Sequence, residues 1–218
     1  MNTLTALPMA PLIERLYAHA SAATSPVFNT ISDDERERLM RSKTDYLEFY
    51  GLLKDLWLPV SRDTGKLLYM LARSTKARAI IEFGTSFGLS TLHLAAALRD
   101  NGGGVLISSE FESSKIALAR EHLIEGGVSD LVDIREGDAL VTLATDLPDA
   151  VDLLLLDGAK ALYGDVLSLV EDHFKPGALV VADNTDYCPD YLAYVRSPEN
   201  GYLSVPLGDD VELSMRLN

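Results

Sequence analysis

Short apolar runs alternate with longer amphipathic segments from residue 79 onward, and this alternation constrains the fold more than any other feature of the chain. The candidate strands are 79–83, 104–109, 131–135, 151–156 and 177–182. The candidate helices between them are 88–100, 113–126, 138–145 and 161–174. Strands and helices that alternate at this spacing indicate an α/β fold, in which a doubly wound, mostly parallel sheet carries helices on both faces.

Both ends of the chain have a different pattern. Residues 1–75 are rich in charge, and their apolar residues recur at helical spacing in the segments 11–20, 46–57 and 61–73. The segments 202–205 and 211–215 flank a Leu-Gly-Asp-Asp turn and predict an antiparallel hairpin. We therefore expect one structural domain, in which an N-terminal helical cap segment (1–75) precedes the core (76–218). The hairpin would bring the sheet of that core to seven strands.

Composition limits the possible partners. A net charge of −14 argues against a nucleic-acid backbone as the main ligand. No apolar run approaches the roughly 20 residues that a membrane helix requires, and the first residues lack the pattern of a secretory signal. The single cysteine, Cys188, cannot form an internal disulfide and fits a reducing compartment. We therefore expect a cytoplasmic protein that binds neither nucleic acid nor membrane.

The loop after the first strand has the composition of a ligand-binding turn. Gly84-Thr-Ser-Phe-Gly88 joins this strand to a helix, where backbone amides and the positive helix end face a ligand. Its G-x-x-x-G spacing differs from the G-x-G-x-x-G of dinucleotide enzymes, so the pattern disfavours an NAD enzyme. The alternative interpretation is a simple turn between strand and helix.

Acidic residues follow the next two strands. Glu110 ends the second strand, where a carboxylate in a doubly wound sheet can accept hydrogen bonds from both hydroxyls of a ribose. Asp138 follows the third strand and is placed to meet the amino group of an adenine. The alternative is that both are ordinary acids at helix N-termini, with Asp138 as an N-cap.

Oxygen ligands follow the last two parallel strands. Asp157 ends one apolar strand, and Asp183 with Asn184 ends the next. Hard oxygen donors suit Mg²⁺, Ca²⁺ or Mn²⁺, so these side chains are candidate metal ligands; the alternative is a set of polar strand ends. Lys160 is a candidate general base, because burial and a nearby cation would disfavour its ammonium form. Its alternative is a solvated surface charge.

From Leu58 to Leu217 these residues resemble the cation-dependent class I S-adenosylmethionine (SAM) O-methyltransferases, a group that includes catechol and caffeoyl-coenzyme A O-methyltransferases. The resemblance implies a Rossmann-like methyltransferase fold, with SAM and a divalent cation (Mg²⁺, Ca²⁺ or Mn²⁺) as cofactors. The cofactor-binding residues that it implies are Val60, Glu82, Gly84, Ser90 and Glu110, and we add Asp138 and Asp157 from their places at the strand ends. The metal ligands that it implies are Asp157, Asp183 and Asn184, and the catalytic residues are Lys160 and Asp157.

The resemblance implies transfer of a methyl group from SAM to a hydroxyl of a small catechol- or diol-like acceptor, assisted by the metal and with Lys160 as general base. Two alternatives stay open: a metal-independent methyltransferase that acts on a nitrogen or a carboxylate, and a SAM-binding protein without catalysis. We expect the N-terminal helices to cover the site and the helix between Asn184 and the hairpin to be trimmed. A homodimer is a further expectation, because the family often forms one.

Overall fold

Seven strands form one sheet in the part of the chain that the structure, a computed structural model, describes: residues 2–23, 31–208 and 210–218. The strand order is β3-β2-β1-β4-β5-β7-β6. Their bounds are β1 Ala79–Phe83, β2 Val105–Glu110, β3 Val132–Glu136, β4 Val151–Leu156, β5 Phe174–Ala182, β6 Tyr202–Leu207 and β7 Val211–Arg216. The expected strands are confirmed, although β5 begins at Phe174 rather than at residue 177.

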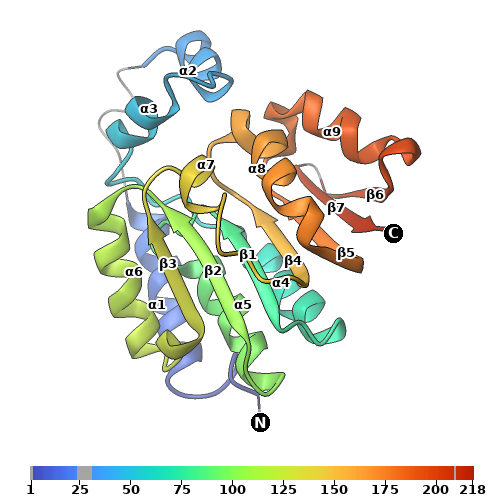
Figure 1. The fold of residues 1–218 in the computed structure, drawn as a ribbon. Coiled ribbons are helices and arrows are strands. Elements are labelled where there is room, and N and C mark those ends of the chain that lie inside the picture. Colours follow the sequence, from blue (N-terminus) through green and yellow to red (C-terminus); the bar gives the residue numbers. More distant parts are fainter. Residues whose placement is uncertain (1, 24–30, 209) are drawn as a thin grey trace.

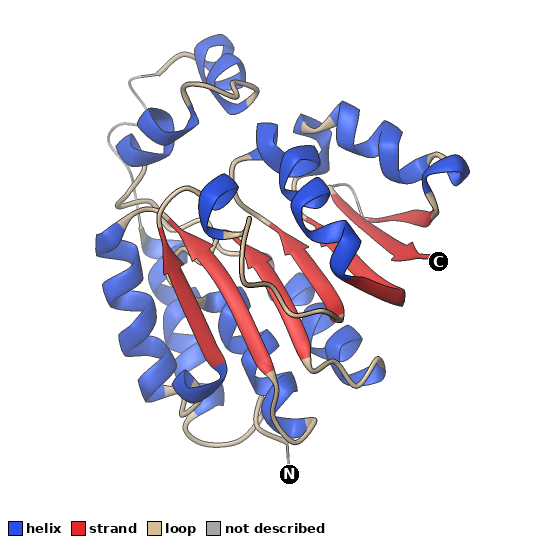
Figure 2. Ribbon diagram, in the orientation of Figure 1, coloured by secondary structure: helices blue, strands red, loops and turns tan. Residues whose placement is uncertain are grey.

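The sheet brings the ends of its parallel strands to one edge. Strands β3, β2, β1, β4 and β5 pair in parallel, and β7 runs antiparallel to both of its neighbours, β5 and β6. Figure 2 shows the parallel arrows pointing the same way. From β1 the chain adds β2 and β3 on one side and then crosses to add β4 and β5 on the other side. Ligands of doubly wound sheets bind in the crevice at such a switch point, which here lies between β1 and β4.

Helices cover both faces of the sheet and stand above its carboxyl edge (Figure 1). Their bounds are α1 Met9–Ala22, α2 Asp33–Met40, α3 Tyr46–Leu52, α4 Arg62–Ser74, α5 Leu89–Asp100, α6 Ser113–Glu125, α7 Ala139–Thr142, α8 Tyr163–Val170 and α9 Pro189–Arg196. Helices α1, α4, α5 and α6 cover one face, α7, α8 and α9 pack on the other, and α2 and α3 lie over the strand ends. Within the described residues, no helix combines the length and apolar character that crossing a membrane requires.

Side chains of the central strands alternate between two cores. In β1, Ile81 and Phe83 pack with residues of α7, α8 and α9, whereas Ile80 packs with α4 and α5. The four leucines of β4 divide in the same way, and all are fully buried. A strand that is covered on both sides needs apolar residues at every position, which explains the continuous apolar runs in the sequence.

One segment ends earlier than the sequence predicts, and a second, expected to be trimmed, contains a helix. Helix α3 ends at Leu52 instead of continuing to residue 57, because the chain turns there and buries Leu53 and Leu56 against Phe49. The segment expected to be trimmed still forms a helix, α9, which begins with Pro189 in its first turn. Proline is favoured at that position, since its missing N–H would have no partner within the helix.

Candidate active site

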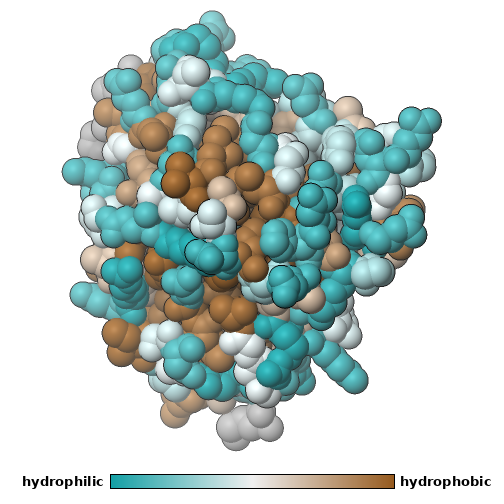
Figure 3. Space-filling view, viewed as in Figure 1, coloured by the Kyte–Doolittle hydropathy of each residue, from teal (hydrophilic) through white to brown (hydrophobic). Residues whose placement is uncertain are grey.

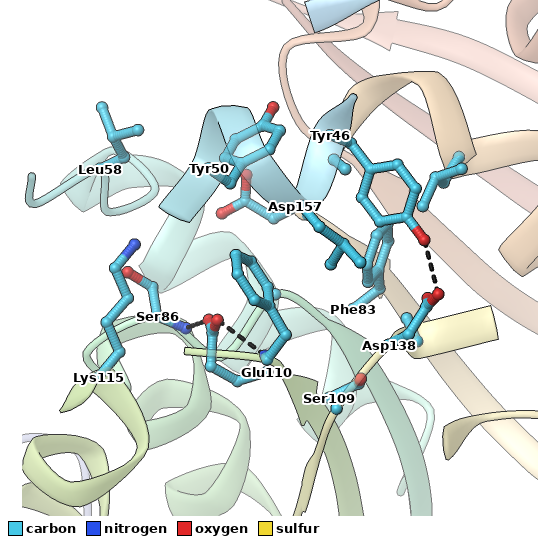
Figure 4. A pocket seen from close by; sticks show the side chains of 18 residues that line it. Tyr46, Tyr50, Leu58, Phe83, Ser86, Ser109, Glu110, Lys115, Asp138 and Asp157 are labelled. Carbon is cyan, nitrogen blue, oxygen red and sulfur yellow. Dashed lines mark hydrogen bonds between the residues drawn. The ribbon is translucent and has the colours of Figure 1, made fainter. Parts of the chain in front are cut away.

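Two pockets open at the carboxyl edge of the sheet. The first encloses about 660 Å³ including its mouth and is lined by the strand-end loops and α3 (Figure 4). The second encloses about 980 Å³ and lies between α2, α3 and the end of β5. The residues that line both are Tyr50, Leu58, Asp157 and Gly158. Two small molecules, one in each pocket, would therefore meet at Asp157 and Gly158.

Apolar side chains frame this region of the surface. Figure 3 shows them gathered over α7 and below α3. The exposed members include Leu47 of α3, which is 40% exposed, and Val141 of α7, which is 69% exposed. Leu47 also lines the first pocket, so that pocket has an apolar rim.

The glycine loop is shaped by the close approach of two strand ends. Gly84 has a φ of +105°, and a Cβ at this position would lie 2.6 Å from the backbone oxygen of Asp157. Only glycine tolerates both the positive φ and that contact. Ser86 then donates its backbone N–H to Glu110 Oε2 at 2.8 Å. The loop thus holds Gly84, Glu110 and Asp157 against the first pocket.

Glu110 is a buried carboxylate in a fixed position. Its Oε2 accepts the N–H of Ser86, and its Oε1 accepts the N–H groups of Phe111 and Glu112 at 3.0 Å each. The residue is 8% exposed. A carboxylate has about four acceptor sites, so Glu110 retains capacity for a ligand hydroxyl. Its contact with a ribose stays a prediction.

Asp138 is the N-cap of α7. Its Oδ1 accepts the backbone N–H of Leu140 at 2.9 Å, and its Oδ2 accepts the hydroxyl of Tyr46 at 2.6 Å. Figure 4 shows this second bond, which ties α3 to the far wall of the first pocket. Asp138 lines the pocket, but both of its oxygens already have partners. Its contact with an adenine stays a prediction.

A narrow arm of the cleft leads to Val60 and Ser90, which both line it. Ser90 donates its hydroxyl to Glu82 Oε1 at 2.6 Å, and Thr91 and Ser108 donate to Glu82 Oε2. Glu82 is fully buried, and burial raises its pKa to about 7. The structure therefore separates Glu82 from the pockets: it lies behind the glycine loop, where it orients the hydroxyl of Ser90.

Lys160 and Asp157 form a buried ion pair. Lys160 Nζ lies 2.9 Å from Asp157 Oδ1 and 2.9 Å from the hydroxyl oxygen of Tyr163. Tyr163 in turn donates to the backbone oxygen of Asp183 at 2.8 Å. Burial disfavours the ammonium, but Asp157 and other neighbours outweigh burial, so the pKa of Lys160 lies above its ordinary value. The sequence analysis expected a lowered pKa for Lys160 beside a cation. The raised pKa found here keeps Lys160 protonated.

Asp157, Asp183 and Asn184 line the second pocket together with Lys160. Burial, followed by the nearby Asp157 carboxylate, raises the pKa of Asp183 to about 7. Asn184 has a φ of +53°, and its Nδ2 lies 3.4 Å from Asp210 Oδ2. The described residues contain no group of three or more His, Cys, Asp and Glu side chains arranged to hold a metal ion. The set is thus two carboxylates and one carboxamide, hard oxygen donors whose crowded negative charge fits a divalent cation with water or substrate as its other ligands.

Three residues of the site were missed by sequence reasoning. Phe83 and Lys115 line the first pocket, and Asp210 lies beside Asn184. Phe83 has the pattern of a core residue, and Asp210 that of an ordinary hairpin turn. Lys115 carried a usable signal, because a cation in the first turn of a helix is electrostatically unfavourable.

If the first pocket holds SAM, as the resemblance implies, Gly158→Ala should weaken its binding by about tenfold, because overpacking of this kind typically costs about 1–3 kcal/mol. A Cβ at Gly158 would lie 2.5 Å from ring atoms of Phe83, which lines the first pocket, so the ring must move. The measurement is calorimetric titration with S-adenosylhomocysteine. Gly164→Ala is the matched control, because a Cβ at Gly164 meets nothing within 4 Å. Equal affinities of the two variants would contradict the steric argument.

A glycine loop after β1, an acid after β2 and a cleft at the switch point are features of doubly wound sheets that bind nucleotide cofactors. A family described as a methyltransferase domain matches residues 81–185. The chain is also 33% identical over 190 residues to the caffeoyl-CoA O-methyltransferase of Petroselinum crispum, a match that covers 74% of this chain and 78% of that protein. The chain belongs to the O-methyltransferase family that includes the catechol and caffeoyl-CoA enzymes.

Further relatives have the same character. The catechol O-methyltransferase of Niastella koreensis is 34% identical over 130 residues, which is 58% of each chain. The crystal structure of an O-methyltransferase from Streptomyces achromogenes in complex with SAM has a TM-score of 0.67 at 26% identity, over 89% of this chain and 96% of that one. The chain spans only 58% and 57% of the length of two catechol O-methyltransferases that it matches.

Proposed function

We propose that this chain transfers the methyl group of SAM to a hydroxyl of a small acceptor, with catechol-like diols as the favoured class. The observation that carries the proposal is the meeting of two pockets at Asp157 and Gly158. The first has the fixed carboxylate of Glu110, and the second contains Lys160 and Asp183. A methyl donor in the first pocket and an acceptor in the second would have their reacting atoms held together, which is a large part of catalysis in group transfer.

In the proposed reaction, an acceptor oxygen bonds to the sulfonium methyl carbon, the carbon–sulfur bond breaks, and its electron pair stays on sulfur. The hydroxyl proton passes to Lys160 Nζ. Lys160 must be neutral at that moment, so it first releases to solvent the proton that Asp157 helps it to hold. The hydroxyl of Tyr163 keeps Nζ in place through this change, because Tyr163 is itself tied to the backbone of Asp183.

Asp157, Asp183 and Asn184 would hold a divalent cation in this proposal. When bound, it would lower the pKa of an acceptor hydroxyl and disfavour the ammonium form of Lys160. The apolar residues of the second pocket, which include Met40, Phe49 and Leu53, would surround an aromatic acceptor and exclude water.

The test is calorimetric titration of S-adenosylhomocysteine, followed by a methyl-transfer assay with catechol and its mono-methyl ether in the presence of Mg²⁺. We expect cofactor binding and turnover of the diol, with much slower turnover of the mono-ether. Failure to bind the cofactor would overturn the proposal. Binding without turnover of any diol, amine or carboxylate would favour a non-catalytic SAM-binding protein.

Glu110→Gln should weaken binding of S-adenosylhomocysteine by at least about tenfold, since hydrogen bonds to a charged group contribute about 1.5–3 kcal/mol. The amide keeps the shape of the side chain but loses the charge that a ribose hydroxyl would use. Glu136→Gln is the matched control, because Glu136 is exposed and pairs in register with Glu110 on the neighbouring strand. Unchanged affinity of Glu110→Gln would remove Glu110 from the cofactor site.

A further inference from the structure

Lys115 is a buried cation in the wall of the first pocket. It belongs to the first turn of α6 and is 8% exposed. Its Nζ lies 5.6 Å from the ring centre of Phe87. Within the described residues it makes no hydrogen bond and no ion pair. Figure 4 shows the side chain extending beside Ser86 toward Leu58.

This position is unfavourable for the protein alone. The N-terminus of a helix carries positive partial charge, which disfavours an ammonium group there. Burial also disfavours the ammonium and lowers the pKa of Lys115, although the charges of Glu110, Glu112 and Asp55 oppose that shift. The ammonium reaches the pocket, where it faces the ring of Phe87 but has no hydrogen-bond acceptor from the described part of the protein. A ligand bound in the pocket would supply that acceptor.

The surroundings of Lys115 place that acceptor at the nucleoside end of the cleft. Lys115 lines the same pocket as Glu110 and Asp138, and it does not line the arm that leads to Val60 and Ser90. The carboxylate of SAM belongs to its amino-acid end, which the arm would hold. At the nucleoside end, the ribose offers hydroxyl oxygens, and a hydroxyl both donates and accepts. One hydroxyl can therefore donate to Glu110 and accept from Lys115.

Resting on the proposed function, we propose that Lys115 donates a hydrogen bond to a ribose hydroxyl oxygen of the cofactor. Glu110 and Lys115 then both contact the ribose: the carboxylate accepts a hydrogen bond from it, and the ammonium donates one to it. The pair makes the first pocket selective for an intact ribose diol. The ammonium gains an acceptor only when the nucleoside is bound, so the contact contributes to binding rather than to the stability of the empty protein.

The experiment compares Lys115→Met with Arg120→Met, which removes an exposed cation from the same helix. Each protein is titrated calorimetrically, at constant ionic strength, with S-adenosylhomocysteine, its 2′-deoxy and 3′-deoxy analogues, and 5′-methylthioadenosine. Lys115→Met should weaken binding of S-adenosylhomocysteine and of 5′-methylthioadenosine by about tenfold, as expected for one charge-assisted hydrogen bond. Binding of the deoxy analogue that lacks the contacted hydroxyl should not change, and Arg120→Met should resemble wild type with every ligand.

Three results would overturn this inference. The first is an unchanged affinity of Lys115→Met for S-adenosylhomocysteine, and the second is an equal loss with both deoxy analogues. The third is a loss that 5′-methylthioadenosine does not show, which would assign the ammonium to the cofactor carboxylate. All ligands require the same folded pocket, so a misfolded variant cannot produce the expected difference between them. If wild type binds none of these ligands, the proposed function fails as well.

Discussion

Lys160→Met is expected to lower turnover by about 10²- to 10⁴-fold, the range that a positioned general acid or base contributes. Affinity for S-adenosylhomocysteine should change little, because Lys160 lines the second pocket and not the first. The substitution also leaves the Asp157 carboxylate buried without its partner, which destabilises a fold by about 3–5 kcal/mol. Turnover should therefore be measured well below the melting midpoint of the variant, with cofactor titration as the check on folding.

Two further variants make this result specific. Lys43→Met removes a lysine whose ion pair with Asp165 is exposed, and it should leave turnover unchanged. Tyr163→Phe removes a hydrogen bond from Lys160 Nζ but keeps its charge, so it should have a smaller effect on turnover than Lys160→Met. If Lys160→Met retains most of the wild-type turnover, another group takes the proton and the proposed role of Lys160 is wrong.

Removal of divalent cations is expected to stop turnover, and added Mg²⁺ to restore it. Asp183→Asn should then weaken Mg²⁺ binding by at least about tenfold, since even residues that only orient metal ligands change metal affinity by about 10- to 100-fold. Burial, followed by the nearby Asp157 carboxylate, raises the pKa of Asp183 to about 7. A bound cation would relieve the repulsion between the two carboxylates. Titration with Mg²⁺ and turnover as a function of its concentration measure both effects.

Asp190→Asn is the control for this pair of measurements, because Asp190 is an exposed carboxylate in the first turn of α9. It should bind Mg²⁺ like the wild type. Turnover that survives complete chelation would contradict the metal-assisted mechanism. It would favour the metal-independent methyltransferase of the same fold, and cofactor binding would remain intact in that case.

The sheet and the ends of its strands could be predicted from sequence because their causes are local. A strand buried on both faces requires a continuous apolar run, and such a run stands at both β4 and β5. Parallel neighbours end at the same edge, so Asp157 and Asp183 were expected together, and both line the second pocket. The position of the glycine loop could be predicted for the same reason, since Gly84 lies where the end of β1 approaches the end of β4.

The roles of single polar side chains depended on partners that are remote in the chain. Asp138 accepts a hydrogen bond from the hydroxyl of Tyr46, which is 92 residues away in the chain. Tyr46 belongs to α3, and no local sequence pattern specifies where α3 lies over the sheet. Glu82 was expected among the cofactor contacts, yet three hydroxyls hold it behind the glycine loop. Lys115 is recognisable in the sequence as a cation in the first turn of a helix, but only the tertiary structure shows that it lines the pocket.

The sequence by itself therefore determined the α/β class, the strand ends and the loop that borders the cleft, because hydrophobic periodicity and backbone conformation act over a few neighbouring residues. Only the tertiary structure decided which polar groups face the cleft, which are satisfied within the protein, and what charge each carries. Those properties arise from burial and from charges and hydrogen bonds across packed elements, as in the ion pair that keeps Lys160 protonated beside Asp157.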